Sequence, residues 1–300
     1  MSPVHRALAV VVVTHSSGDT LAECVARALA SADVGELAVI DNASADGSID
    51  ALEARFGGDP RLRVQRNPDN RGFAQACNQG AALTRAPHLM FLNPDCLLEP
   101  DSVAKLLDVA SRHPEAGVIG ADVRDRAGLP ESAARRRDPT PWRSLTTALG
   151  LDRLAGRWPA LAGVAVPPPH AAREITRVDA TSGALMLVPR TVFERVGGFD
   201  PGYPLHAEDL DLCRRVRDAG MRVACVNTIR VTHGKGGSSR HRPLFVARHK
   251  HRGMWRWFVK FDPAARNPLL RTAVWIGLWL HFAALLPINA WRQARAGAQR

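Results

Sequence analysis

Apolar residues along the chain fall into two alternating patterns. Short, unbroken apolar runs, of which residues 7–13 (ALAVVVV) are the clearest, predict strands that are covered on both faces. Segments with apolar residues at helical spacing lie between these runs, and residues 19–31 are typical. The apolar face of that segment comprises Leu21, Cys24, Val25, Ala28 and Leu29. This alternation predicts an α/β fold with a mostly parallel sheet and helices on both of its faces.

The same two patterns place the remaining elements. Further strands are expected within residues 36–44, 61–67, 87–96, 116–123, 184–188 and 222–231. Further helices are expected within residues 44–56, 72–86, 101–113 and 191–196. Residues 124–177 are rich in Pro and Arg, which predicts a mobile excursion around a short helix near residues 145–154.

Polar residues follow several of the predicted strands. Asp41-Asn42, Asn70-Arg71-Gly72 and Asn93-Pro94-Asp95 each stand where a strand gives way to a loop. The carboxyl ends of parallel strands line the ligand crevice of an open sheet, so these residues are candidates for a binding site. Taken singly, such residues are more often part of a turn or a helix cap than ligand contacts.

Asp95 and His233 are candidate metal ligands. A carboxylate at the exposed end of a strand suits Mg²⁺ or Mn²⁺, which fill their other positions with phosphates and water. His233 precedes a loop that contains glycines and Lys235, and such a loop can present N–H groups and a cation to a diphosphate. The alternative is that His233 is only a loop residue.

Three carboxylates crowd the segment HAEDLDLCRR, residues 206–215. As structural residues, Glu208 or Asp209 would be a helix N-cap or a first-turn acid that stabilises the helix dipole, and Asp211 would pair with Arg214 or Arg215. The Gly- and Pro-rich loop before them leads back towards the predicted crevice. One of these carboxylates could therefore be a general base for a hydroxyl nucleophile.

The net charge of +11 belongs to the C-terminal quarter of the chain. From Arg230 onward there are 14 Lys and Arg residues and one acid, whereas the first 229 residues hold 26 basic and 28 acidic residues. Residues 248–261 mix cations with Trp and Phe, which is typical of a helix at an anionic membrane surface. Such a mixture also fits a single-strand nucleic-acid platform, but the acid-lined crevice argues against a nucleic-acid partner.

Residues 272–288 carry no formal charge and are borderline in length for crossing a membrane. Three arrangements follow from this composition: a membrane-lying or re-entrant helix, a single span, or a soluble helix packed on the rest of the protein. The five widely spaced cysteines, which include no C-x-x-C pair, predict neither disulfides nor a zinc site and indicate a reducing, cytosolic compartment. Residues 4–15 mimic a short signal peptide, but a buried first strand explains them better.

The chain resembles the inverting family 2 glycosyltransferases, and among them the bacterial rhamnosyltransferase-like branch. The resemblance covers about residues 8 to 240 and rests on seven motifs in order. These are VVVTHSS, VIDNASADGS, NRGFAQACNQG, FLNPDC, SGALMLVPR, GGFDPGYPLHAEDLDLCRR and VTHGKGGSS. The resemblance implies a GT-A fold with a Rossmann-like sheet, a nucleotide-sugar donor, and a divalent metal, Mg²⁺ or Mn²⁺.

By motif position, Asp209 would be the catalytic base, and Asp95 and His233 would bind the metal. The expected donor-binding residues are Thr14, Asp41, Asn42, Asn70, Gly72, Asn78, Asn93 and Lys235. His206 and Glu208 are expected to contact the acceptor. Three positions depart from the family pattern: His15, Asn93 in place of the first acid of D-x-D, and Leu205-His206 in place of an aromatic pair.

The resulting hypothesis is an inverting, metal-dependent transferase that moves rhamnose from dTDP-rhamnose to a hydroxyl of a polyprenyl-diphosphate-linked or polysaccharide acceptor. Residues 1–240 would form the catalytic domain, and residues 241–300 a helical tail that associates with membrane. The protein would lie at the inner, cytoplasmic face of the plasma membrane. The alternative is an inactive or accessory nucleotide-sugar-binding protein, because Asn93 replaces an acid.

Overall fold

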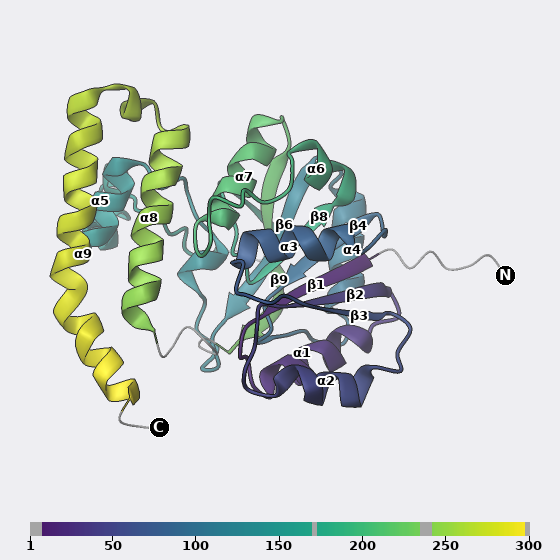
Figure 1. Cartoon of the computed structure of the whole chain (residues 1–300). Helices are drawn as coiled ribbons and strands as arrows, with labels where there is room; N and C mark the ends of the chain where they lie inside the picture. Colours follow the sequence, from purple (N-terminus) through teal and green to yellow (C-terminus); the bar gives the residue numbers. More distant parts are fainter. Residues whose placement is uncertain (1–7, 170–172, 235–241, 298–300) are drawn as a thin grey trace.

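The computed structural model describes residues 8–169, 173–234 and 242–297. In this part of the chain nine strands form one sheet, in the order β3-β2-β1-β4-β8-β6-β9-β5, and β7 pairs with β9 (Figure 1). The strands are β1 (Leu8–Thr14), β2 (Val34–Asp41), β3 (Leu62–Arg66), β4 (His88–Leu92), β5 (Cys96–Leu97), β6 (Ala116–Arg124), β7 (Ile175–Val178), β8 (Leu185–Pro189) and β9 (Arg222–His233).

Helices cover both faces of the sheet, as the alternating pattern predicts (Figure 1). They are α1 (Thr20–Leu29), α2 (Ser48–Phe56), α3 (Phe73–Ala82), α4 (Ser102–Arg112), α5 (Pro141–Ala148), α6 (Arg190–Arg195), α7 (Glu208–Asp218), α8 (Pro243–Phe261) and α9 (Pro268–Gly297). The five residues predicted to form the apolar face of the first helix are the buried residues of α1.

The first strand shows why its sequence lacks polar alternation. Leu8, Val10 and Val12 pack into an apolar cluster with α1, α2 and α4. The intervening residues, Ala9 and Val11, pack with α3, α6 and α7 on the opposite face of the sheet. Both faces of β1 are therefore buried, and an unbroken apolar run supplies apolar side chains to both clusters.

The sheet is mostly parallel, but three strands run against their neighbours. β8 lies antiparallel between β4 and β6, and β5 and β7 are antiparallel to β9. The sequence does not reveal these directions, because a buried strand reads the same in either direction. The antiparallel pairing of β5 with β9 has a direct effect on the site described below.

The irregular segment between β6 and β7 is tied to the sheet. Arg135 donates a 2.8 Å hydrogen bond to Asp122 of β6, and both side chains are only 2% exposed. This buried ion pair replaces the free excursion that composition predicts. The short helix also begins earlier than expected, because Pro141 occupies its first turn and the Thr140 hydroxyl caps it by accepting from Arg143 N.

Two long helices, α8 and α9, stand side by side at one end of the molecule (Figure 1). The first is anchored in the core, because Trp257 is buried in the cluster that contains α3, α6 and α7. Burial of an aromatic side chain of this size contributes on the order of 2–3 kcal/mol. The second packs on the first, where His251 Nε2 lies 3.0 Å from His281 Nδ1.

Helix α9 contains a 24-residue apolar stretch, Pro268–Trp291, with a mean hydropathy of 1.6 and no buried residue in its most apolar window. Leu269 is 82% exposed and Leu280 is 65% exposed. This exposure favours the two membrane arrangements over a soluble helix packed on the catalytic domain. Its exposed surface is of the kind that a membrane covers.

Candidate functional site

Several of the predicted residues meet at the carboxyl ends of the parallel strands. Thr14 and Asp41 are in register at the ends of β1 and β2, and both are buried. Asp41 Oδ1 accepts a 3.0 Å hydrogen bond from Ser44 N, so the turn explanation of this aspartate also holds. Thr14 Oγ1 donates to Ser17 Oγ at 2.8 Å.

An amide network connects this edge to the loop before α3. Asn42 Nδ2 donates to Gly72 O at 3.3 Å, and Asn67 Nδ2 donates to Asn42 Oδ1 at 2.9 Å. Gly72 adopts φ 83°, and a Cβ there would lie 2.6 Å from Pro204 O. Only glycine therefore allows the 202–207 loop to come this close to the predicted donor site. Asn70 Oδ1 holds the same turn by accepting from Gly72 N.

Two predicted donor-binding residues do not join this group. Both polar atoms of the Asn78 side chain are used on one residue: Nδ2 donates to Phe199 O at 2.8 Å, and Oδ1 accepts from Phe199 N at 2.9 Å. These contacts give Asn78 a structural role in holding the 197–202 turn, so we omit it from the donor site. Lys235 lies outside the described residues.

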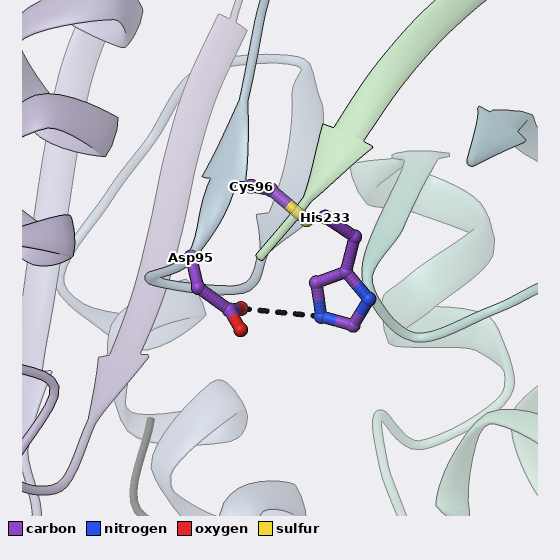
Figure 2. Close-up of side chains that lie close together, drawn as sticks. All are labelled: Asp95, Cys96 and His233. Carbon is purple, nitrogen blue, oxygen red and sulfur yellow. Dashed lines mark ion pairs between the residues drawn. The ribbon is translucent and has the colours of Figure 1, made fainter. Parts of the chain in front are cut away.

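The predicted metal ligands are neighbours because of the β5–β9 pairing. Cys96 pairs with His233, which brings Asp95 Oδ1 within 3.1 Å of His233 Nε2 (Figure 2). Asn93 Nδ2 lies 3.3 Å from the same nitrogen. On the other side of the ring, His233 Nδ1 lies 3.0 Å from Glu131 Oε1.

These acids control the protonation of His233. Burial disfavours its charged form, but the hydrogen bonds to Asp95 and Glu131 outweigh burial and raise the pKa of His233 to about 9. Glu131 thereby fixes the ring so that Nε2 faces Asp95, which is the usual arrangement around a histidine ligand. A metal ion would have to displace the proton from Nε2.

Cys96 completes a cluster whose ligand atoms all lie within 4.8 Å of one another. Its thiol donates to Ala184 O at 3.3 Å, and burial raises the pKa of Cys96 well above its usual value. A protonated thiol is a poor ligand for a hard cation. Asp95 and His233 therefore fit a Mg²⁺ or Mn²⁺ ion that takes its other ligands from a diphosphate, and Cys96 does not.

Helix α7 begins at the acidic segment with strained backbone. His206 and Ala207 both adopt positive φ, 66° and 69°, directly before Glu208 and Asp209. Two consecutive non-glycine residues in this region are rare and cost stability, and such strain is often found at active sites. Both acids lie in the first turn of the helix and Ala207 is at the cap position, so the first-turn explanation of these carboxylates also holds.

The Asp209 carboxylate is the best-connected group of the site. Oδ2 accepts hydrogen bonds from Arg136 at 2.6 Å and from Gly183 N at 3.0 Å, and Oδ1 accepts from Leu210 N at 2.8 Å. Burial opposes ionisation, but the Arg136 charge and these hydrogen bonds outweigh it and keep the pKa of Asp209 below its usual value. Asp209 is therefore ionised at neutral pH.

Glu208 has the opposite tendency. Burial and the adjacent Asp209 charge raise the pKa of Glu208 to about 8, and its Oε2 has no hydrogen-bond partner among the described residues. Two adjacent acids thus hold different protonation states, which is the condition that separates a base from a proton donor. His206 is neutral as well, since burial and the nearby Lys250 lower its pKa to about 4.

The third acid of the segment has the structural role that the sequence offered as an alternative. Asp211 is fully buried and accepts 2.6 Å hydrogen bonds from Arg215 and from Lys260 of α8. Of the two expected partners, Arg215 is the one that binds. Asp211 therefore fastens α8 to α7 and takes no part in the crevice.

One dipeptide joins the base to the metal-ligand pair. Gly183 N donates to Asp209, and the next residue, Ala184, accepts through its carbonyl oxygen from Asn93 N at 3.0 Å. The Asn93–Cys96 segment and Asp209 thus lie on either side of residues 183–184, at the start of β8. The predicted base and the loop that carries Asp95 are therefore anchored on the same dipeptide.

Two residues of the site were missed in the sequence. Arg136 and Glu131 lie in the irregular segment, 73 and 102 positions from the residues they contact. The run Arg135-Arg136-Arg137, ahead of Asp138, is the local signal that could have drawn attention to this segment. Nothing local indicates which arginine enters the site.

Comparisons with known proteins identify the family of the chain. Residues 9–165 match the family model described as Glycosyl transferase family 2, and residues 159–258 match that of Glycosyl transferase family 21. An N-acetylglucosaminyl-diphospho-decaprenol L-rhamnosyltransferase from Mycobacterium tuberculosis is 30% identical over 88% of this chain and 92% of its own. Rhamnosyltransferase WbbL from Escherichia coli is 28% identical over 61% of this chain and 63% of its own.

Solved structures share the fold. GalNAc-T7 with UDP, GalNAc and Mn²⁺ superimposes with a TM-score of 0.61 at 19% identity, covering 84% of this chain and 47% of that one. The mannosyltransferase PcManGT from Pyrobaculum calidifontis, with GDP-Man and Mn²⁺, gives 0.59 at 17% identity, covering 97% and 75%. The fold, the sequence relatives and the family match agree, and the chain belongs to glycosyl transferase family 2.

Proposed function

We propose that this glycosyltransferase moves rhamnose from dTDP-rhamnose, with inversion, to a hydroxyl of a polyprenyl-diphosphate-linked or polysaccharide acceptor in cell-surface glycan synthesis. The observation that carries the mechanism is the ionised Asp209, bound by Gly183 N next to Ala184, whose carbonyl anchors the loop of Asp95. The choice of sugar is supported by the names of the Mycobacterium and Escherichia relatives.

In this proposal the donor lies along the strand ends. Thr14, Asp41 and Asn42 would bind the nucleoside, and Asn70 and Gly72 would shape the turn beside it. Asn93, in place of an acid, lies with its amide nitrogen 3.3 Å from His233 Nε2 and leaves Asp95 as the carboxylate that would face the donor. Asp95 and His233 would hold a Mg²⁺ or Mn²⁺ ion, which when bound offsets the negative charge that develops on the departing diphosphate.

Asp209 would take the proton of the acceptor hydroxyl. As that oxygen attacks the anomeric carbon, the bond from this carbon to the diphosphate breaks on the opposite face, and the configuration inverts. A carboxylate has about four acceptor positions, and Arg136, Gly183 and Leu210 occupy three of them. One position is left for the hydroxyl. The protonated Glu208 and the neutral His206 can hydrogen-bond the acceptor sugar.

The helical tail would hold the enzyme against the inner face of the plasma membrane. Helix α8 is fastened to the catalytic part through Trp257 and through the Lys260–Asp211 pair. Helix α9 packs along α8. If α9 crossed the bilayer, α8 with its Arg and Lys residues would have to lie in the hydrocarbon layer as well. This geometry supports a helix that lies in the interface.

Nucleoside diphosphate release tests the proposal. Wild type would be assayed with UDP-, dTDP- and GDP-sugars and Mg²⁺ or Mn²⁺, in lipid-linked acceptor extract, beside Asp209→Asn and Asp95→Ala. Metal-dependent turnover of dTDP-rhamnose, lost in both variants, is the expected result. Failure of the wild type to bind or turn over any donor would support an accessory role, and turnover of another donor would replace rhamnose.

A further inference from the structure

A cavity of about 310 Å³ lies between the 202–204 loop and the two tail helices. Its lining combines three tryptophans, two arginines and a histidine, namely Trp255, Trp275, Trp279, Arg252, Arg256 and His249. The volume is at the small end of ligand pockets, enough for a head group and the start of a chain. The rest of a long ligand would have to leave along the helices.

The two arginines of the cavity differ in their contacts. Arg256 bonds to Asp200 at 2.9 Å and lies over the Tyr203 ring, so its charge is balanced by the catalytic part. Arg252 forms no hydrogen bond or ion pair within residues 8–169, 173–234 and 242–297. Its guanidinium is therefore available to a ligand, and guanidinium groups bind phosphates through two parallel hydrogen bonds.

The cavity adjoins the loop that carries the predicted acceptor residues. Gly253, one residue from Arg252, is so close to that loop that a Cβ would lie 2.7 Å from His206 O. Pro204 forms part of the cavity lining, and its carbonyl accepts from Phe73 N beside the predicted donor site. A group bound on Arg252 is thus next to the turn that ends at Glu208 and Asp209.

The opposite wall belongs to the exposed apolar helix. Trp275 and Trp279 lie on α9, within the stretch that would contact membrane. Tryptophan prefers the boundary between apolar and aqueous surroundings. The cavity therefore joins an apolar surface on one side to a cationic, aqueous site on the other.

We propose that this cavity binds the diphosphate and the first isoprenoid units of a polyprenyl-diphosphate-linked acceptor. Arg252 and His249 hold the phosphates, Trp275 and Trp279 flank the first isoprenoid units, and the glycan extends to His206 and Glu208. This assignment rests on the proposed function. A nucleotide has no apolar chain to place against α9, and a bilayer phospholipid has no glycan to extend towards Asp209.

Binding of tritiated farnesyl diphosphate to the full chain tests this assignment, by equilibrium dialysis in neutral detergent micelles. We expect Arg252→Gln to raise the Kd about tenfold or more, because it removes a charged hydrogen-bond donor. Arg248→Gln is the matched control, since Arg248 lies one turn earlier on α8, is exposed, and does not line the cavity. Trp279→Leu should weaken the binding of farnesyl diphosphate and leave the binding of inorganic diphosphate unchanged.

Three results would overturn the proposal: equal affinities in Arg252→Gln and Arg248→Gln, equally tight binding of inorganic diphosphate, or displacement by phosphatidylglycerol at equal concentration. Circular dichroism and thermal melting confirm that each variant is folded. Binding of dTDP-rhamnose to wild type is measured separately. Lipid binding without donor binding would refute the proposed function and leave only a cavity that binds prenyl diphosphates. Donor binding without lipid binding would refute the cavity assignment alone.

Discussion

Arg136 reaches across 73 positions of sequence to place a guanidinium nitrogen 2.6 Å from Asp209 Oδ2. The arginine comes from the irregular segment, and the aspartate comes from the first turn of α7. The charge of Arg136 stabilises the ionised carboxylate against the effect of burial. The proton affinity of the proposed base is therefore set by a residue outside its own motif.

Replacing Arg136 with Met should shift the pH profile of the transferase. Without the guanidinium, burial dominates and the pKa of Asp209 rises. A base with a raised pKa is protonated at higher pH, so the acidic limb of kcat/KM should move upward in pH. Arg137→Met is the matched control, because Arg137 bonds to Gly163 O and Ala165 O instead. An unmoved acidic limb in Arg136→Met would contradict the assignment of Asp209 as the base.

The adjacent acids should respond differently to amide substitution. Asp209→Asn removes a general base and should lower kcat by about 10²–10⁴. Glu208→Gln keeps the neutral form that Glu208 adopts below its pKa of about 8, so activity at pH 7 should change far less. Single-turnover rates at saturating donor separate the two variants, and equal losses at pH 7 would refute the different roles.

Metal binding should depend on Glu131 although it is not a proposed ligand. Loss of an outer partner of a histidine ligand usually costs 10–100-fold in metal affinity, which is the effect expected for Glu131→Gln. In wild type, affinity should rise from pH 7 towards pH 9, because the cation competes with the proton that His233 holds up to about pH 9. Calorimetric titration with Mn²⁺ measures both effects. Asp101→Asn is the control, since that acid pairs with Lys105 on the surface.

The joint between α7 and α8 should contribute strongly to stability. Asp211→Ala leaves Arg215 and Lys260 without their shared buried partner, and breaking such a pair costs about 3–5 kcal/mol. Asp218→Ala breaks an ion pair whose aspartate is 51% exposed, and should cost no more than about 1 kcal/mol. Urea unfolding at pH 7 compares them. Similar losses in the two variants would show that the buried network is not a fastening point.

The tail should behave as an interfacial anchor. Alkaline carbonate should extract the full chain from membranes, because α9 packs along α8 rather than crossing the bilayer. Binding to anionic vesicles should weaken as salt rises, since Arg and Lys residues of α8 contribute to it. Resistance to carbonate, measured by sedimentation, would instead indicate a span.

The parts of the fold that follow from local pattern were predictable from the sequence. Burial of Leu21 and Val25 on one face of α1 needs only the helical period, and β1 needs only an apolar run. The direction of β8 was not predictable, because burial on both faces produces the same sequence in either orientation. The two-residue strand β5 is too short to form any pattern.

The site divides in the same way. Asp95, His233 and Asp209 follow from motif position; Asp95 and His233 are in contact, and Asp209 and the loop of Asp95 share the anchor at Gly183 and Ala184. Arg136 and Glu131 were missed because their partners are fixed by the path of an irregular segment rather than by periodicity. The prediction that Trp257 lies at a membrane surface was wrong, because this side chain is buried in the core. The aromatic residues of a cationic helix can pack against a membrane or against the protein core, and the sequence pattern is the same in both cases.

The place of β8 in the sheet has a consequence for a chain that is still on the ribosome. β8 lies between β4 and β6 but is synthesised after both of them. Until residue 189 has emerged, those two strands lack the neighbour that joins them, and each leaves an open edge. The nascent chain can therefore complete the strands that carry Thr14 and Asp41 early, but the halves of the sheet join only when nearly two thirds of the protein has emerged.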